Sequence, residues 1–141
     1  MTVMAATGRL GELGRFCLVG GSGVLVNLAV FQGALMLWAP ILPASALAFV
    51  VAASSNFVLN RAWTFRGSAS REGTAVRWAK FLGASLAGLA ANLAVLAVLS
   101  AWFSIPSLPA QLAGIAAGTL LNYRLSCMWV FHPEAPAPAP S

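Results

Sequence analysis

Two long stretches without a charged side chain constrain the fold of this chain more than any other feature. They run from Phe16 to Asn60 and from Phe81 to Tyr123, and neither contains Asp, Glu, Lys or Arg. A single membrane span needs about 20 apolar residues, so each stretch is long enough for two helices joined by a tight turn. With only 8% charged residues, the chain could not cover the surface of a soluble globular domain. The sequence therefore predicts an all-α integral membrane protein with four transmembrane helices.

The eight basic residues predict how these helices are oriented. All of them lie before the first uncharged stretch, between the two stretches, or just after the second, and the turns inside the stretches carry none. Lys and Arg are retained on the cytoplasmic side of a membrane, so we expect both termini and the central connection to be cytoplasmic. Topology and contact with anionic lipid head groups account for the positive net charge. A nucleic-acid partner is therefore not expected.

We expect the four helices to cover about residues 16–38, 44–62, 78–102 and 110–131. Residues 1–14 are predicted to be an N-terminal cytoplasmic segment, residues 15–131 the transmembrane domain, and residues 132–141 a disordered Ala/Pro tail. The five tryptophans all fall at predicted helix ends, where indole rings meet the membrane interface. The distribution of tryptophan thus supports the same spans as the distribution of charge.

The second half of the chain repeats the first at an offset of 65 to 66 residues, which indicates an internal duplication. The segment from Asn56 to Phe65, for example, corresponds to the segment from Asn122 to Phe131. Each repeat holds two spans, so the halves share one orientation and are predicted to form parallel-related hairpins around a central polar seam. Gly114 and Gly118 form a GxxxG pattern, which packs helices closely either inside the chain or in a homodimer.

Five asparagines in the predicted spans are candidate site residues, because an amide in hydrocarbon must find a partner or line a wet cavity. Asn27 and Asn92 lie near the middle of their helices, where they either clamp neighbouring helices or contact a substrate. Asn56, Asn60 and Asn122 lie nearer the cytoplasmic ends, in the company of basic side chains. We therefore expect this inner group to contact a substrate.

Arg61 and Arg124 lie within the cytoplasmic ends of two predicted spans. Each of them either extends to the inner lipid head groups or binds an anion, because no Asp or Glu in a predicted span is available to pair with it. An unpaired guanidinium suits an anion such as a phosphate. The neighbouring rings of Trp63, Tyr123 and Trp129 offer flat faces on which a sugar could stack.

Several chemistries are excluded by what the sequence lacks. It has no Ser-His-Asp or Cys-His set and no phosphate-binding loop, and its one histidine, His132, follows the last predicted span. The predicted spans also lack the carboxylate on which small proton-coupled exporters depend. We therefore expect neither an enzyme, nor a metal site, nor a cofactor.

Three segments resemble the GtrA-like family of small bacterial membrane proteins: RFCLVGGSGVLVNLAVF (15–31), ASSNFVLNRAWTF (53–65) and LLNYRLSCMWVF (120–131). The most specific part is the NFxxNRxWTF pattern that begins at Asn56. In its second copy, Ser126 and Cys127 stand where Asn60 and Arg61 would be. The resemblance implies a multi-pass protein of the bacterial cytoplasmic membrane. Such a protein moves polyprenyl-phosphate-linked sugars across it, or supports the glycosyltransferases that use them for cell-surface polysaccharide.

Two functions fit these observations, and the first is flipping of a polyprenyl-phosphate-linked monosaccharide. The phosphate would be held by Arg61 and Arg124, with Arg15 and Lys80 at the cytoplasmic entrance. Sugar hydroxyls would bind the inner asparagines, and the path would be lined by Asn27 and Asn92. The second function is that of a non-transporting adaptor, which recruits a glycosyltransferase through the basic loop at residues 66–80. The expected partners are the lipid-linked sugar, membrane lipids, a glycosyltransferase and, as a further option, a second copy of the chain.

Overall fold

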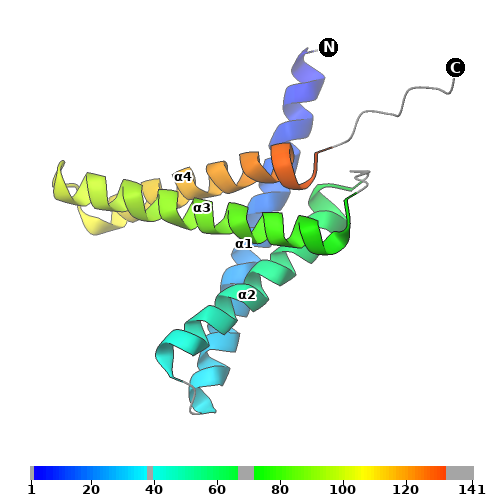
Figure 1. The fold of residues 1–141 in the computed structure, drawn as a ribbon. Helices are drawn as coiled ribbons and strands as arrows, with labels where there is room; N and C mark the ends of the chain where they lie inside the picture. The colour runs from blue at the N-terminus through cyan, green and yellow to red at the C-terminus, as the bar shows by residue number, and fades with distance from the viewer. Residues whose placement is uncertain (1, 38–39, 67–71, 133–141) are drawn as a thin grey trace, which may run out of the picture.

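The computed structural model describes residues 2–37, 40–66 and 72–132, and within these ranges the chain is helical and contains no strand. The α-helices are α1 (Thr2–Met36), α2 (Ile41–Leu59), α3 (Thr74–Ala101) and α4 (Ser107–Leu125) (Figure 1). α2 continues into a π-helical turn, η1 (Asn60–Thr64), and α4 continues into a second one, η2 (Ser126–Val130). The predicted all-α fold class is confirmed.

Prolines set the start of the second helix in each half. Pro40 precedes α2 and Pro106 precedes α4, both in an extended conformation with ψ of 150° and 146°. Pro43 and Pro109 lie in the first turns of these helices, where a backbone N–H would have no partner within the helix. The two uncharged stretches are therefore each broken into two helices, as the sequence predicts.

Both α2 and α4 end in the same irregularity. After η1 the N–H of Phe65 donates to the Asn60 carbonyl at 2.8 Å, and after η2 the N–H of Phe131 donates to the Ser126 carbonyl at 2.8 Å. A π-helical hydrogen bond spans one residue more than an α-helical one, so it changes the direction of the side chains that follow. The rings of Phe65 and Phe131 consequently face each other.

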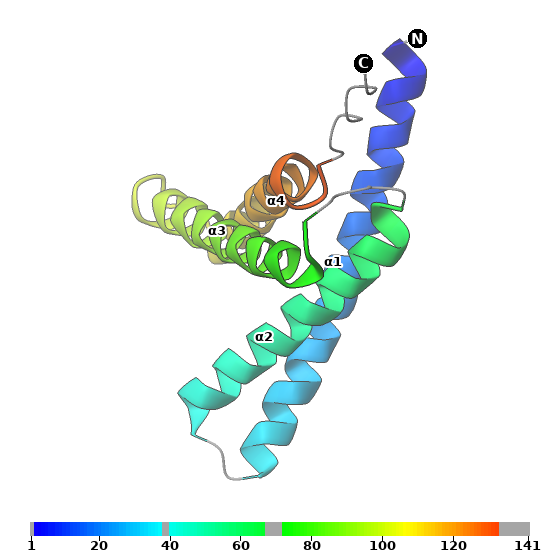
Figure 2. The same cartoon turned by 45° about the vertical axis from the view of Figure 1, so that its right-hand side comes forward.

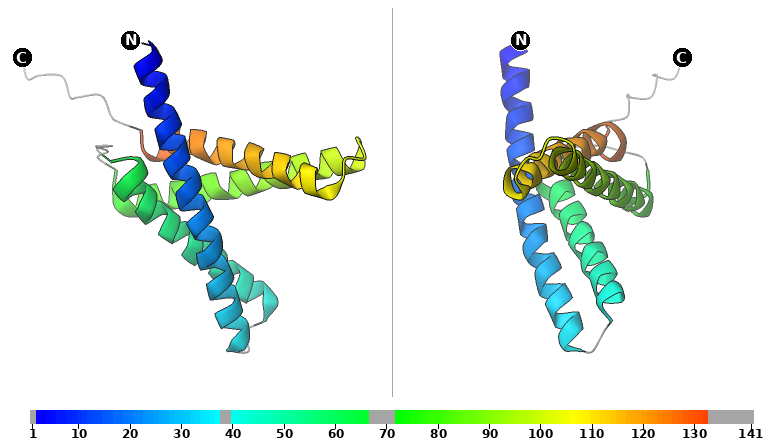
Figure 3. Two further views of the ribbon diagram at one scale, coloured as in Figure 1. Left: turned by 180° about the vertical axis from the view of Figure 1, so that it is seen from behind. Right: turned by 90° about the vertical axis from the view of Figure 1, so that its left-hand side faces the viewer.

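The chain forms two helical hairpins, since α1 packs along α2 and α3 packs along α4. The hairpins meet at one end, which we call the junction. It contains the ends of η1 and η2, the start of α3 and the part of α1 around Phe16. From the junction the hairpins diverge, so that their far ends lie well apart, and the first turns of α1 project beyond it (Figures 1, 2 and 3).

The central polar seam that the repeat predicts between the halves is not formed. Asn56 of α2 packs on Gly23 of α1, where an added Cβ would lie 2.7 Å from the Asn56 Cγ. In the other hairpin, Asn122 of α4 packs on Gly88 of α3. Each asparagine is used inside its own hairpin, because a glycine on the neighbouring helix leaves room for the amide. The prediction of a shared seam is wrong for this reason.

Three segments of the described residues are long and apolar enough to cross a membrane: Arg9–Met36, Pro43–Thr64 and Thr74–Ala101. α4 is not among them, because Gln111, Asn122 and Arg124 lower its mean hydropathy. Helices that can span a membrane are therefore present as predicted, and the fourth span stays a prediction.

Two helices begin earlier than the sequence predicts. α1 begins at Thr2, so residues 2–14 continue the first helix. α3 begins at Thr74, which places Arg77 on a helix and not in the connecting loop. Within that loop, residues 67–71 lie outside the described residues, and so does the predicted Ala/Pro tail apart from His132.

Candidate functional site

The junction is built around six aromatic rings, which we call the ring cluster: Phe16, Phe57, Phe65, Phe81, Tyr123 and Phe131. At its centre Phe65 stacks on Phe131, with ring centroids 4.5 Å apart and ring planes at 15°. All the rings are buried except that of Tyr123, which is half-buried. The packing of these rings against one another therefore holds the two hairpins together.

The ring contacts of the two halves mirror each other. Phe16 lies 5.5 Å from Tyr123 across the junction, measured between ring centroids. Phe81, the counterpart of Phe16 in the repeat, lies 5.8 Å from Phe57, the counterpart of Tyr123. The interplanar angles of the two pairs, 66° and 55°, are also similar. The repeated sequence thus makes repeated contacts at the junction.

A basic side chain lies over an indole ring on each side of the ring cluster. The guanidinium of Arg15 lies 6.0 Å from the ring centroid of Trp63, and the ammonium of Lys80 lies 5.8 Å from that of Trp129. The two pairs are counterparts in the repeat. The structure therefore brings together the predicted site residues Arg15 and Trp63. It likewise places Trp129, the third ring that the sequence offers for stacking, beside Lys80.

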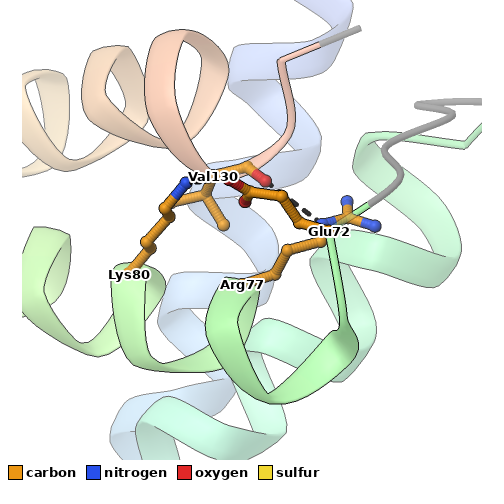
Figure 4. Close-up of polar contacts among 4 residues, drawn as sticks. All are labelled: Glu72, Arg77, Lys80 and Val130. Carbon is orange, nitrogen blue, oxygen red and sulfur yellow. Dashed lines mark hydrogen bonds and ion pairs between the residues drawn. The ribbon is translucent and has the colours of Figure 1, made fainter. Parts of the chain in front are cut away.

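The predicted cations Arg61, Arg124 and Lys80 differ in whether a carboxylate already balances their charge. Arg61 and Arg124 are exposed, and Arg61 donates a hydrogen bond from Nη1 to the Thr74 hydroxyl at 3.0 Å, which links η1 to the start of α3. Lys80 forms an ion pair with Glu72 (Figure 4). The two exposed guanidiniums are accessible to an anion, whereas the charge of Lys80 is balanced by a carboxylate.

Arg77 is a buried cation of the junction that sequence reasoning did not single out. Its side chain is 4% exposed, its Nε donates to the Val130 carbonyl at 3.2 Å, and its guanidinium lies 4.9 Å from the ring centroid of Phe131 (Figure 4). Within the described residues its Nη2 is buried and has no hydrogen-bond partner. The helical spacing of the sequence could have predicted its burial, because Arg77 shares the buried face of α3 with Phe81 and Gly88.

Tyr123 joins the two hairpins through its hydroxyl. The hydroxyl oxygen lies 3.3 Å from the Arg9 carbonyl oxygen and 3.4 Å from Glu12 Oε2, both on α1. Glu12 lies on the part of α1 that precedes Phe16, outside the spans that the sequence predicts. Tyr123 thus ties α4 to α1 with a ring that already packs in the cluster.

The five candidate asparagines lie in different environments. Asn60 is 1% exposed, and its Oδ1 accepts a hydrogen bond from Thr64 Oγ1 at 2.7 Å. Asn27 is half-buried on α1. Within the described residues, a buried Oδ1 without a hydrogen-bond partner occurs in Asn56, Asn92 and Asn122. A buried amide oxygen without a donor is costly, so these three amides reduce the stability of the helix contacts in which they lie.

An open hollow of about 180 Å³ lies between α3 and α4. Its polar and small lining residues are Ser85, Gly88, Asn92, Gly118, Thr119 and Asn122. The hollow thus combines two of the unpaired amides with two hydroxyl groups. None of its lining residues is charged. It therefore suits a neutral group that forms hydrogen bonds and not an anion.

The GxxxG pattern of α4 packs inside the chain. A Cβ added at Gly114 would lie 2.7 Å from the Asn92 carbonyl oxygen, and one added at Gly118 would overlap the Gly88 carbonyl oxygen. Only glycine lets the two backbones approach this closely. Of the two uses that the sequence left open, packing against α3 is the one observed, and the motif gives no support to a homodimer.

Comparison with known proteins gives one family. The family model described as GtrA/DPMS, transmembrane domain, matches residues 15–131. The match includes both hairpins apart from the first turns of α1, and with them the whole ring cluster and the hollow. A comparison with curated proteins finds no match. Together with the apolar helices, the family match makes the chain a multi-pass membrane protein.

Proposed function

This chain belongs to the family of GtrA/DPMS transmembrane domains, and on that premise we propose that it flips a polyprenyl-phosphate-linked monosaccharide across the cytoplasmic membrane. Membership in this family fits a membrane protein tied to lipid-linked sugar processing. The sugar would serve the synthesis or modification of cell-surface polysaccharide. In this scheme the protein breaks and forms no covalent bond, so it acts as a transporter and not as an enzyme.

One observation carries the proposal: exposed cations and indole rings gather at the same end of both hairpins. Arg15 and Arg61 are exposed there, and Trp63 lies beside Arg15. A guanidinium binds a phosphate through short, charge-assisted hydrogen bonds, and an indole face packs against the C–H groups of a sugar ring. Away from the junction the helices expose apolar side chains, which suit the polyprenyl chain in hydrocarbon.

We further propose that the junction lies at the cytoplasmic face of a bacterial inner membrane, with four spans and both termini inside. In the described residues the basic side chains lie at or near the junction or on the start of α1, and the far ends of both hairpins have none. This distribution supports a cytoplasmic junction. The mirrored contacts of the ring cluster support two hairpins of the same orientation. α4 would complete the fourth span by turning its amides toward α3.

The contacts at the junction suggest a different role in phosphate binding for each of its cations. Arg61 and Arg124 would hold the phosphate, and Arg15 would help to admit it. Lys80 would contribute less, because Glu72 already balances its charge. No nucleotide-binding loop occurs in the sequence, so net flipping would follow consumption of the lipid-linked sugar on the far side.

The contacts of the asparagines likewise suggest different roles for them. Asn56 and Asn122, whose Oδ1 atoms have no donor among the described residues, would bind sugar hydroxyls. Asn60 would act by holding η1 in shape, since Thr64 already bonds to its amide. Asn27 and Asn92 would line the path through the membrane.

The test is flipping by the purified protein in liposomes. A polyprenyl-phosphate hexose is reconstituted in both leaflets, and its accessibility to a membrane-impermeant reagent is followed over time. We expect the Arg61→Ala/Arg124→Ala variant to flip at least about tenfold more slowly, because charge-assisted bonds to the phosphate are lost. Arg66→Ala, which removes another exposed arginine near the junction, is the matched control. Equal rates in all three proteins would overturn the assignment of the phosphate to Arg61 and Arg124.

A second candidate function is the adaptor for a polyprenyl-phosphate glycosyltransferase. The observation that favours it is the divergence of the two hairpins, whose far ends lie well apart (Figure 2). The adaptor would bind its transferase through residues 66–80. Co-purification of a transferase that is lost when residues 67–71 are scrambled, which leaves α3 and its contacts intact, together with no flipping in liposomes, would favour this function over the first.

A further inference from the structure

Several residues that line the hollow between α3 and α4 are replaced at the corresponding positions of α1 and α2, although the two hairpins are repeats. Ser85 corresponds to Gly20, and Thr119 corresponds to Ala53, so both hydroxyls of the hollow are missing in the first half. Gly118 corresponds to Ala52, which adds a methyl group at the contact between the helices. The repeat thus serves as an internal comparison. At these two positions, only α3 and α4 carry a hydroxyl.

Further substitutions reinforce this difference. Ile115, which lines the apolar side of the hollow, corresponds to the larger Phe49 in α2. The asparagines are kept, because Asn92 corresponds to Asn27 and Asn122 to Asn56. Packing on glycine explains conserved amides in both halves, but it does not explain the added hydroxyls of the second half. These hydroxyls therefore point to a ligand.

The chemistry of the hollow defines that ligand. Its lining carries hydroxyls and amides and no charge, so it binds a neutral group that both donates and accepts hydrogen bonds. Asn92 and Asn122 line the hollow, and a primary amide both donates and accepts hydrogen bonds, as does a polyhydroxylated ring. Leu89 and Ile115 offer an apolar wall for the C–H face of such a ring.

The size and the position of the hollow agree with this ligand. A volume of about 180 Å³ is well below the roughly 300–1,000 Å³ of sites for drug-sized molecules, so it suits a single ring. The hollow is open at the surface of the hairpin, which would let a ring enter while it remains attached to a lipid. Ser85 follows Lys80 by roughly 7.5 Å along α3, so the hollow begins one to two turns from the cations of the junction.

We propose that the α3–α4 hollow is the binding site for the sugar ring of the lipid-linked substrate, and that the α1–α2 hairpin has no such site. This inference rests on the proposed function. It deepens that function by assigning recognition of the neutral sugar to Ser85, Thr119, Asn92 and Asn122, apart from the phosphate at the junction.

The experiment compares two ligands on the detergent-purified full chain: a polyprenyl-phosphate hexose and the same polyprenyl phosphate without the sugar. The test variant is Ser85→Ala/Thr119→Val, which removes both hydroxyls with little change of shape. Ser100→Ala, which removes an exposed hydroxyl of α3 away from the hollow, is the control. We expect wild type and control to bind the sugar-linked lipid about tenfold more tightly than the bare lipid, as two hydrogen bonds allow. The test variant should bind both lipids equally, with unchanged affinity for the bare lipid.

The other possible outcomes show whether the hollow fails as the sugar site or the proposed flipping function fails. A test variant that keeps the preference for the sugar-linked lipid, or a wild type that never had it, overturns the hollow as the sugar site. Loss of affinity for both lipids in the test variant does the same. If wild type binds neither lipid, the proposed function fails. The hollow is then judged by saturation-transfer NMR with a methyl hexoside, where a signal that is lost in the test variant supports it and no signal in wild type overturns it.

Discussion

At the scale of single residues, the burial of Arg77 is the least expected feature of the junction. A guanidinium that leaves water needs partners, and Arg77 has the Val130 carbonyl and the face of Phe131. Both partners belong to the end of the α4–η2 segment, so the side chain fastens that end to the first turn of α3. Arg61 and Arg124, by contrast, remain exposed and free to meet a ligand.

We predict that Arg77→Gln lowers the stability of the purified protein by about 1–3 kcal/mol, because a buried hydrogen bond and a cation–π contact are lost. Thermal unfolding in detergent measures this change. Arg124→Gln, at an exposed position, should change stability by less than about 0.5 kcal/mol. Equal effects of the two substitutions would show that Arg77 does not fasten η2 to α3.

At the scale of secondary-structure elements, glycines decide how α3 and α4 pack. Gly88, Gly114 and Gly118 lie where the two backbones come closest, and Asn92 and Asn122 fill the space beside them. Hydrophobic attraction between helices is absent in lipid, so this close contact and its amides hold the hairpin together. The same contact shapes one side of the hollow.

A matched pair of glycine substitutions tests this packing. We predict that Gly118→Ala destabilises the protein by about 1–3 kcal/mol, because the new methyl group meets the rigid carbonyl of Gly88 and forces the helices apart. Gly21→Ala adds the same group on α1, where nothing lies within 4 Å of it, and should be neutral or stabilise by up to about 1 kcal/mol. Unfolding in detergent compares the two. A Gly118→Ala protein as stable as Gly21→Ala would contradict the close packing of α3 on α4.

At the scale of the whole molecule, two hairpins diverge from one junction. The proposed function depends on how these hairpins are oriented in the membrane. The sequence predicts four spans, but α4 carries several polar side chains, so the fourth span has to be tested directly. The question is whether the end of η2 returns to the side of the membrane on which η1 ends.

Sided labelling of introduced cysteines in whole cells answers it. In a Cys17→Ala/Cys127→Ala background, we expect Ser104→Cys to react with an impermeant thiol reagent from outside. Arg66→Cys and His132→Cys should react only after the membrane is opened. Labelling of His132→Cys from outside, with Arg66→Cys still protected, would mean that α4 does not cross the membrane.

Much of this protein can be predicted from its sequence, because the determinants are local. A run without charge has to leave water, prolines end helices, and a repeated pattern repeats its contacts. The two hairpins, their turns and the gathering of basic residues at one end follow from these rules. The NFxxNRxWTF pattern also points to the family that the family model identifies.

Only the tertiary structure decided which helix each polar side chain contacts. Whether an asparagine faces its own hairpin or the other half depends on which helix offers a glycine opposite it, and spacing along the chain does not reveal that. The predicted seam was lost for this reason. The burial of Arg77 depends likewise on η2, whose widened turn brings the Val130 carbonyl and Phe131 to it. The sequence by itself determined which stretches are apolar enough to leave water, since that depends on the transfer free energy of their side chains. The packing of helix against helix determined which of them meet, since that depends on shape.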